Sequence, residues 1–309
     1  MKLSIYLSIY LSIYLSIYLS VSLNGQVINS QEKAENAGIK RNALYNLEEI
    51  KVRWKKAALE NCLGVPCVVT PPAPSFTCGT STISDYDGNV YNTVVIGTQC
   101  WTKQNLKVTK YNDGTNIPEI PGSGTWNNTI VTGARTVYEV SGTPVSGYVG
   151  NYGYLYNWYA FTNSRKLCPE GWHGPTDAEW TNLIRIYEPG ASASVDGDQS
   201  LSAGTVLKSS LTNTTAGVGL GWDPASSSSG PAIPSPGTNT SGFSALPGGE
   251  RGNDANFFNV RSLAIFWSAT EDSGRPGNAW ERVMSANFGG VGRSSYGKWF
   301  GRSVRCLRD

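Results

Sequence analysis

The chain has 309 residues, of which 16% are charged, and its formal net charge of +2 gives no reason to expect nucleic acid or an acidic membrane surface as a partner. The 35 glycines, 16 tyrosines and 10 tryptophans are typical of a loop-rich, aromatic-rich protein rather than a helical bundle. The single histidine, His173, excludes His-cluster metal sites and argues against a Ser-His-Asp triad.

Residues 1–26 predict an export signal. Met1 and Lys2 are followed by four copies of Leu-Ser-Ile-Tyr and then by small and polar residues, and one positive charge before an apolar run is the pattern of a signal peptide. The rival interpretation is an uncleaved membrane anchor, because the run is about long enough to span a bilayer. A Ser and a Tyr in every four residues weaken that reading. We therefore expect a protein that is secreted or held at the outer cell surface.

Residues 27–69 are expected to form a helical segment before the main domain. Apolar residues recur at three-to-four spacing across residues 30–61, which favours one helix. Three roles stay open for it: docking on the main domain, association with an envelope partner or a second copy, and a surface stalk. The Pro-rich residues 70–76 predict a stiff linker, so we place the main domain at residues 77–309.

Six cysteines in an exported chain suggest three disulfide bonds. They are Cys62, Cys67, Cys78, Cys100, Cys168 and Cys306. Many connectivities are open to six cysteines, but local spacing favours Cys62–Cys67, Cys78–Cys100 and Cys168–Cys306. No pair has the Cys-x-x-Cys spacing, which argues against zinc binding and against thioredoxin-type redox chemistry.

Residues 81–86 and 90–97 predict a β-hairpin, because Asp-Gly-Asn between two strand-like runs is typical of a tight turn. Calcium binding by Asp85 and Asp87 is the alternative. The later Gly and the terminal Glu of an EF-hand loop are missing, however. Turn chemistry explains every residue here, so we expect no metal and no other cofactor. A further short strand or turn is expected over residues 99–106.

Residues 151–160 form a dense aromatic run. Such rings usually fill a core or stack beneath loops, where each buries a large area. An exposed shelf for sugar rings is the functional alternative, since exposed aromatic patches mark binding sites.

The strongest local signal lies in residues 168–180. Thr176 fits the N-cap of a helix and Glu179 its third position, which together make a capping box. We therefore interpret Asp177 and Glu179 as helix-capping and dipole residues rather than as an acid–base pair. Pro189 and Gly190 are expected to end this helix, and His173 is expected to be structural, bonded to local backbone.

The remaining chain predicts long loops and a late set of strands. Residues 191–240 are rich in Ser, Gly, Thr and Asn, which favours loops. Residues 266–271 and 279–284 have the pattern of buried strands, and residues 303–306 are expected to add a closing strand.

Several stretches, in chain order, resemble one known family. They are residues 87–91, 96–101, 105–106, 154–160, 168–180, 242–249, 266–271 and 303–309. Together they resemble the major paralogous domain first noted in Fibrobacter succinogenes and found in Bacteroidota-type bacteria. Gly174 departs from the pattern, because the family usually has an apolar residue before Pro-Thr. The resemblance implies an exported, surface-associated domain whose biochemical role is poorly defined across the family.

More distantly, the helix start and the closing strand resemble the C-type-lectin-like fold of formylglycine-generating enzymes and of retroelement-diversified receptors. This resemblance implies an α+β architecture with a twisted antiparallel sheet, one or two helices and long loops, here preceded by the N-terminal helix. It leads us to expect a non-catalytic binding module for polysaccharide or another surface ligand. Rings that stack on sugars would then come from Trp126, Trp158, Trp280 or Trp299.

Two alternative functions stay open. The first is a structural or assembly protein of the cell envelope, which would act through residues 30–61. The second is a copper-dependent oxidase of the formylglycine-generating type, which would need free thiols. We do not favour the oxidase, because Cys306 is best explained as the disulfide partner of Cys168, and a disulfide-bonded thiol is neither nucleophile nor metal ligand.

Overall fold

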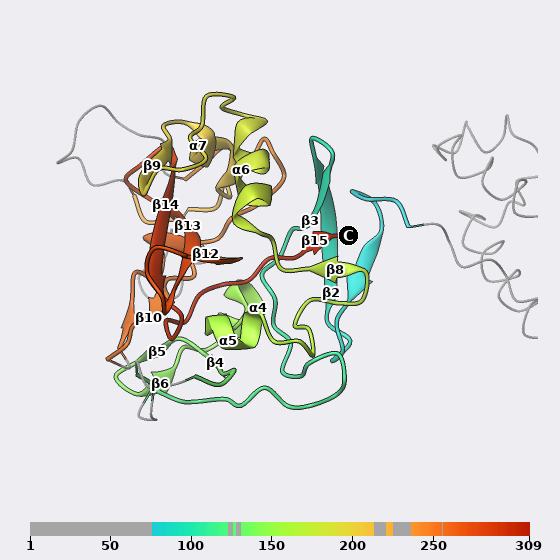
Figure 1. Ribbon diagram of the computed structural model, residues 1–309, viewed down its shortest axis with the longest axis vertical. Coiled ribbons are helices and arrows are strands. Elements are labelled where there is room, and N and C mark those ends of the chain that lie inside the picture. Colours follow the sequence, from blue (N-terminus) through green and yellow to red (C-terminus); the bar gives the residue numbers. More distant parts are fainter. Residues whose placement is uncertain (1–75, 123–125, 128–130, 213–220, 225–235, 255) are drawn as a thin grey trace, which may run out of the picture. The chain divides into compact units, whose positions relative to one another are not determined.

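The computed structural model describes residues 76–122, 126–127, 131–212, 221–224, 236–254 and 256–309. They belong to one compact unit, Phe76–Asp309, which is built mostly of antiparallel strands (Figure 1). The predicted signal peptide, the helix over residues 30–61 and the Cys62–Cys67 pair lie outside the described residues. Within the described ranges, none of the helices has the length and apolar character needed to cross a membrane.

The elements of this unit are short. The strands are β1 (Thr82–Ser84), β2 (Val90–Ile96), β3 (Gln99–Thr102), β4 (Arg135–Thr136), β5 (Glu139–Val140), β6 (Thr143–Pro144), β7 (Leu155–Tyr156), β8 (Trp172–His173), β9 (Gly197–Ser200), β10 (Glu250–Arg251), β11 (Phe257–Phe258), β12 (Leu263–Glu271), β13 (Asn278–Ser285), β14 (Val291–Gly297) and β15 (Leu307–Arg308). The helices are α4 (Tyr148–Tyr152), α5 (Trp158–Phe161), α6 (Asp177–Arg185) and α7 (Ala203–Leu207).

A five-stranded antiparallel sheet has the order β1-β2-β3-β15-β8. The predicted hairpin is confirmed, because β1 pairs with β2 across the turn at residues 85–89. The predicted closing strand at residues 303–306 was placed too early. The strand is β15, where Leu307 pairs with Trp101 on one side and with His173 on the other. Ser303 instead forms an isolated bridge to Phe266.

A four-stranded antiparallel sheet has the order β12-β13-β14-β9. The predicted strands at residues 266–271 and 279–284 fall inside β12 and β13. Side chains alternate along each strand, as the period of two requires. Phe266, Met284 and Val291 therefore point to one face of the sheet, where they join the main core.

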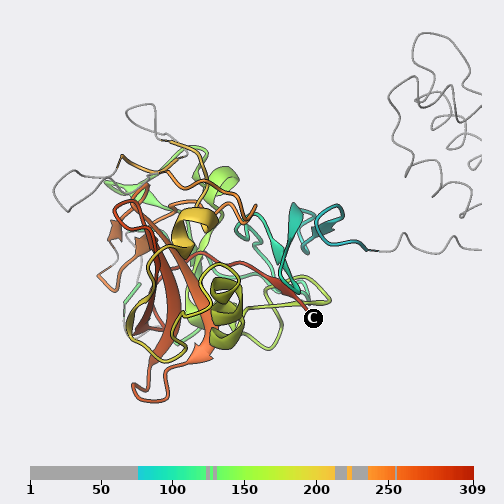
Figure 2. The same ribbon diagram turned by 90° about the horizontal axis from the view of Figure 1, so that it is seen from above.

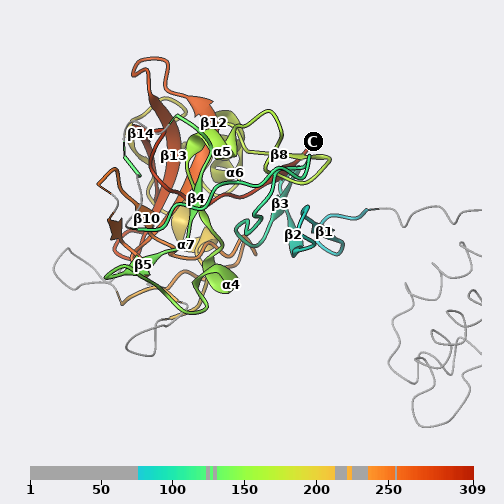
Figure 3. The same cartoon turned by 90° about the horizontal axis from the view of Figure 1, so that it is seen from below.

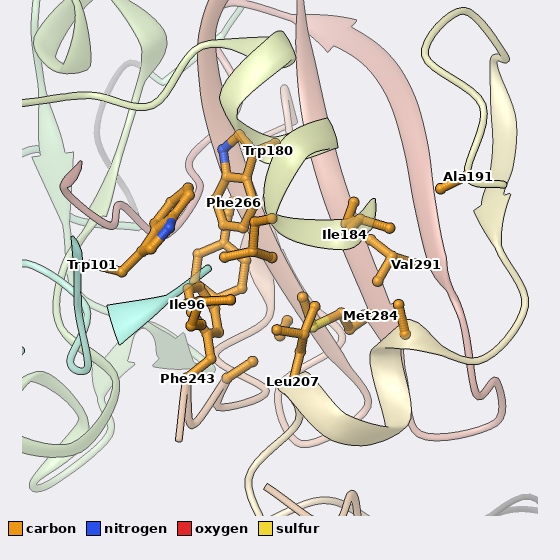
Figure 4. Close-up of a cluster of buried hydrophobic side chains, with 14 of the residues drawn as sticks. Ile96, Trp101, Trp180, Ile184, Ala191, Leu207, Phe243, Phe266, Met284 and Val291 are labelled. Atoms are coloured by element: carbon orange, nitrogen blue, oxygen red, sulfur yellow. The ribbon is translucent and has the colours of Figure 1, made fainter. Parts of the chain in front are cut away.

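The main core lies where α6 and α7 cover this face of the four-stranded sheet (Figures 1 and 2). Trp101 and Ile96 reach it from the other sheet, and Trp180 and Ile184 reach it from α6 (Figure 4). The rings of Trp101 and Trp180 lie 4.8 Å apart between centroids. Each such buried large side chain contributes about 1.5–3 kcal/mol of stability, so this cluster fixes α6 between the two sheets.

The start of α6 has the predicted capping box. The Thr176 hydroxyl accepts a hydrogen bond from the Glu179 amide at 3.3 Å, and the Glu179 carboxylate accepts one from the Thr176 amide at 2.7 Å. The predicted end at Pro189 and Gly190 is wrong, because the helix stops at Arg185. The amide of Ile186 donates to a carbonyl only three residues back, which tightens the helix into a turn.

Two disulfides are present among the described residues, and both are pairs that the spacing favoured. Cys78–Cys100 ties the chain before β1 to β3. Cys168–Cys306 ties the loop before β8 to the residue before β15. One disulfide therefore attaches the chain before β1 to the five-stranded sheet, and the other joins the segments that lead into β8 and β15.

Candidate functional site

The face of the four-stranded sheet that points away from α6 carries a hollow of about 440 Å³. Its floor includes Ile265 of β12, Val283 of β13, and Gly292 and Ser294 of β14. These residues alternate with those that enter the main core, so they point to the opposite side. We call this hollow the sheet groove. Outside the groove lining, α5 lies against β12 of the same sheet (Figure 3).

Small side chains keep the sheet groove open. A Cβ atom added at Gly292 would lie 3.7 Å from Val283 Cβ, which is ordinary van der Waals contact. A side chain at position 292 would thus fit against Val283, and because Gly292 has none, the groove is deeper at this point. Ser294, the next outward residue of β14, is also small, and the following one is Tyr296, a large ring. Along β14 the sheet groove therefore runs over two small residues and ends at the Tyr296 ring.

Four aromatic rings flank the sheet groove: Phe258, Phe288, Tyr296 and Phe300. Tyr296 is 45% exposed and Phe258 is 42% exposed. The Tyr296 and Phe300 rings pack edge to face, with 5.5 Å between centroids. Large exposed rings around a hollow are unusual, because a ring without a partner loses the benefit of burial. They make the sheet groove the best candidate binding site among the described residues.

An acid–arginine–acid group lies in the groove wall. The Arg302 guanidinium donates from Nε to Glu281 Oε2 at 2.6 Å and from a terminal nitrogen to Glu250. It also lies over the Phe300 and Tyr296 rings, 4.7 and 5.4 Å from their centroids. Burial raises the pKa of Glu281 to about 7, against the attraction of Arg302, which lowers it. The groove therefore combines apolar ring faces with a carboxyl group that titrates near neutral pH.

A second hollow of about 470 Å³ lies beside the five-stranded sheet. Its lining includes Cys100, Gln99, Glu179 and Arg308, and no aromatic ring is among the described residues that line it. Glu179 is already used by the capping box. We therefore do not consider this hollow the main site.

The prediction that the Trp126 ring stacks on sugars is wrong. The side chain is 1% exposed, and the Arg251 guanidinium lies 4.5 Å from its ring centroid. Trp126 is thus part of a buried cation–π contact and has no free face for a ligand. Arg251 fills this position because its donors reach the backbone carbonyls of Ile120 and Pro121.

The other three predicted rings are half-buried and have protein partners. Trp158 donates from its indole nitrogen to the Ser268 carbonyl at 3.0 Å, under the Lys298 ammonium group. The Arg293 guanidinium lies 3.3 Å from the centroid of Trp280.

Trp299 packs against Gly297, where an added Cβ would come within 2.4 Å of the ring. In the part of the chain that the structure describes, neither Trp299 nor any other of the four predicted tryptophans lines the sheet groove.

The two weak calcium candidates serve as turn acceptors. Asp85 Oδ1 accepts hydrogen bonds from the amides of Asp87 and Asn89 at 3.0 and 2.9 Å, and its other oxygen accepts one from the Tyr91 hydroxyl. Asp87 accepts from the amide and hydroxyl of Thr109. Within the described ranges, no group of three or more potential ligands is placed to hold a metal ion.

His173 has different partners from those expected. Its Nδ1 lies 2.6 Å from Asp309 Oδ1 and its Nε2 lies 2.9 Å from Glu179 Oε1, so the ring bonds to two carboxylates rather than to local backbone. Partial burial alone would lower the pKa of His173. The hydrogen bonds and charges of Asp309 and Glu179 outweigh burial and raise that pKa above its ordinary value of 6.5.

The residues of the sheet groove were not predicted from the sequence. One signal was present, because the predicted buried strand over residues 279–284 contains an acid, Glu281, next to Arg282 in an otherwise apolar run. An acid in a buried strand needs a partner. Its partners Glu250 and Arg302 lie far away in the chain, so no local pattern could identify them.

A scan against protein families matches residues 94–308 to the Fibrobacter succinogenes major domain. The matched range covers well over half of the chain and includes every residue that lines the sheet groove. Comparison with the curated proteins finds no match, and comparison with the solved structures finds none either. The chain belongs to the family of the Fibrobacter succinogenes major domain.

Proposed function

We propose that this chain is a non-catalytic binding module, secreted or held at the cell surface, that binds a carbohydrate ligand in the sheet groove. The observation that carries the proposal is the pair of exposed rings, Phe258 and Tyr296, beside a trough floored by Gly292 and Ser294. Ring faces stack on the C–H faces of sugars, while the polar wall offers hydrogen-bond partners for hydroxyl groups.

The C-type-lectin-like architecture expected from the resemblance is part of this proposal. It is supported by the antiparallel sheet β12-β13-β14-β9 and by the long connections around it. On β14, the three residues that line the groove, Gly292, Ser294 and Tyr296, all keep some exposure, so this strand can form part of a recognition face.

Retention on immobilised polysaccharides tests the proposal. We expect Tyr296→Ala and Phe258→Ala each to weaken binding by about tenfold, because a central ring contact contributes about 1–2 kcal/mol. Tyr86→Ala is the matched control, since Tyr86 is a 52% exposed ring on the β1–β2 turn, outside the groove. Circular dichroism checks that each variant is folded. Equal retention of all three variants, or no retention of the folded wild type on any polysaccharide, contradicts the proposal.

The two alternative functions rest on other parts of the chain. An oxidase of the formylglycine-generating type needs free thiols, and the disulfide between Cys168 and Cys306 speaks against it. Thiol titration of the unreduced protein tests this point. A structural or assembly role would act through residues 30–61, and deleting residues 27–75 tests it by localisation of the remaining domain.

A further inference from the structure

In the groove wall, only one of the two carboxylate oxygens of Glu281 accepts a hydrogen bond from a described residue. Among the described residues, Arg302 is the only donor to this carboxylate, and it bonds to Oε2. The Glu281 side chain is almost fully buried, and it lines the sheet groove. Oε1 is not among the fully buried side-chain atoms that lack a hydrogen-bond partner, and since Glu281 lines the groove, the groove is the side from which a ligand can reach it. The wall of the groove therefore presents one acceptor oxygen to which none of the described residues donates.

The chemistry of this oxygen defines what a ligand must offer. An ionised carboxylate only accepts hydrogen bonds. A ligand that covered Oε1 without donating to it would leave a buried, unpaired acceptor, which is costly. A hydroxyl or another donor on the ligand satisfies Oε1 and avoids that cost.

The charged residues of the groove restrict the class of ligand further. Among the described residues that line the groove, the acids are Glu250, Glu281 and, at the exposed rim, Asp198, and the one cation is Arg302. An acidic ligand would meet like charge. A cationic ligand would compete with Arg302, which already bonds to both Glu250 and Glu281 and lies over two of the rings. An uncharged ligand with hydroxyl donors avoids both conflicts.

We propose that the sheet groove selects uncharged, hydroxyl-bearing glycans over acidic and cationic ones, and that Glu281 Oε1 is the acceptor for a ligand hydroxyl group. This inference rests on the proposed function, because it names the ligand class of the same groove. Glu281 is thus the specificity-determining residue, while Phe258 and Tyr296 supply ring stacking that any glycan can use.

The protonation state of Glu281 makes the inference sensitive to pH. The charged groups that face it are Arg302 and Glu250, and Arg302 keeps its charge because these two acids raise its pKa against the effect of burial. A ligand hydroxyl that donates to Glu281 favours the ionised carboxylate. Acidification through a pKa of about 7 protonates this group and removes its charge, so we expect the affinity to fall as the pH falls.

The first experiment measures binding of the full chain by isothermal titration calorimetry at about pH 8. The probes are neutral cellohexaose, maltohexaose and mannohexaose, together with oligogalacturonate and N,N,N-trimethylchitosan oligosaccharides of matched length, whose quaternary ammonium groups stay cationic at this pH. We expect binding to at least one neutral probe, at least about tenfold tighter than to either charged class. Equal or tighter binding of a charged class overturns the inference and leaves the proposed function standing. No binding of any probe contradicts the proposed function itself.

The second experiment assigns the selectivity to Glu281. For the neutral probe that binds, we expect the wild-type affinity to fall about tenfold between pH 8 and pH 6, the size that protonation of one group with a pKa near 7 produces. Glu281→Gln should weaken binding about tenfold at pH 8 and remove the pH dependence. Glu170→Gln is the control, because Glu170 is an exposed acid outside the groove.

The wild-type pH profile needs no substitution, so the test survives if Glu281→Gln fails to fold. An affinity that stays constant between pH 8 and pH 6, or that rises on acidification, overturns the role of Glu281. Gly292→Leu is a second variant, because a Cβ added there makes only ordinary van der Waals contacts, so the longer side chain should block the groove and abolish binding without disturbing the sheet.

Discussion

Single side chains in this fold often serve several partners at once. Arg305 is fully buried and has no acid among its hydrogen-bond partners: it donates to the carbonyls of Thr102, Phe243 and Ser244 and to the side chain of Asn105. Burial lowers the pKa of Arg305 to about 9. The planar guanidinium with its five donors suits this task, whereas a lysine would leave several carbonyls unsatisfied. One arginine thus joins three separate segments.

His173 gives a prediction about the pH dependence of stability. Its folded-state pKa lies above the ordinary 6.5, so its stabilising effect is full below pH 6.5 and is lost as the pH rises through the folded-state pKa. We expect wild type to exceed His173→Gln in melting temperature at about pH 5.5, with a smaller difference at about pH 8.5. Other titrating groups, including Glu281, are common to both proteins and cancel. A difference that grows with pH would contradict the assignment.

At the residue scale, local chemistry was readable from the sequence and distant chemistry was not. The roles of Thr176 and Glu179 followed from a spacing of three residues. The second role of Glu179, as a partner of His173, and the contact of His173 with Asp309 did not, because Asp309 meets His173 only when β15 pairs with β8.

At the scale of elements, α5 and the entry to α6 interlock at Gly174. A Cβ atom at this position would lie 2.3 Å from a carbon of the Phe161 ring, which is buried. In this chain the Phe161 ring of α5 occupies that space, and glycine at position 174 is its necessary counterpart.

This interlock predicts a coupled pair of substitutions. Gly174→Ala should lower the free energy of unfolding by about 1–3 kcal/mol, because the added methyl group overpacks the site. In a Phe161→Leu background, Gly174→Ala should lower the free energy of unfolding by clearly less. Urea denaturation of wild type, the two single variants and the double variant measures this coupling. Gly150→Ala is the control, since nothing lies within 4 Å of a Cβ added there. Additive effects at positions 161 and 174 would refute the interlock.

The sequence predicted some elements well and missed others for physical reasons. The β12 and β13 strands were found because their runs of apolar and aromatic residues are typical of buried strands. The strand β14 was missed, because Val291–Gly297 contains two glycines and two serines, which favour loops when read locally. Those same small residues, Gly292 and Ser294, open the sheet groove. The feature that hid the strand therefore also creates the candidate site.

At the scale of the whole molecule, the two disulfides close loops of very different length. Cys168 and Cys306 are separated by 138 positions, and Cys78 and Cys100 by 22. A longer closed loop removes more conformational freedom from the unfolded chain. The Cys168–Cys306 bond is therefore expected to contribute more to stability.

Paired alanine substitutions test this ranking. Replacing Cys168 and Cys306 should lower the free energy of unfolding by about 1.5 kcal/mol more than replacing Cys78 and Cys100, the difference that loop-closure entropy gives for these two lengths. Guanidinium denaturation under non-reducing conditions measures both. Equal costs, or a larger cost for the shorter loop, would show that packing rather than loop closure dominates.

The position of β15 has a consequence for how the protein is made. This strand lies between β3 and β8, yet its residues, Leu307 and Arg308, are synthesised after every other described element. Until they emerge, β3 and β8 each keep an unpaired edge, and such edges invite association with other chains. A copy that is cut short before Leu307 cannot hide them. A copy that lacks β15 is therefore expected to associate with other chains more readily than one in which β15 pairs with both β3 and β8.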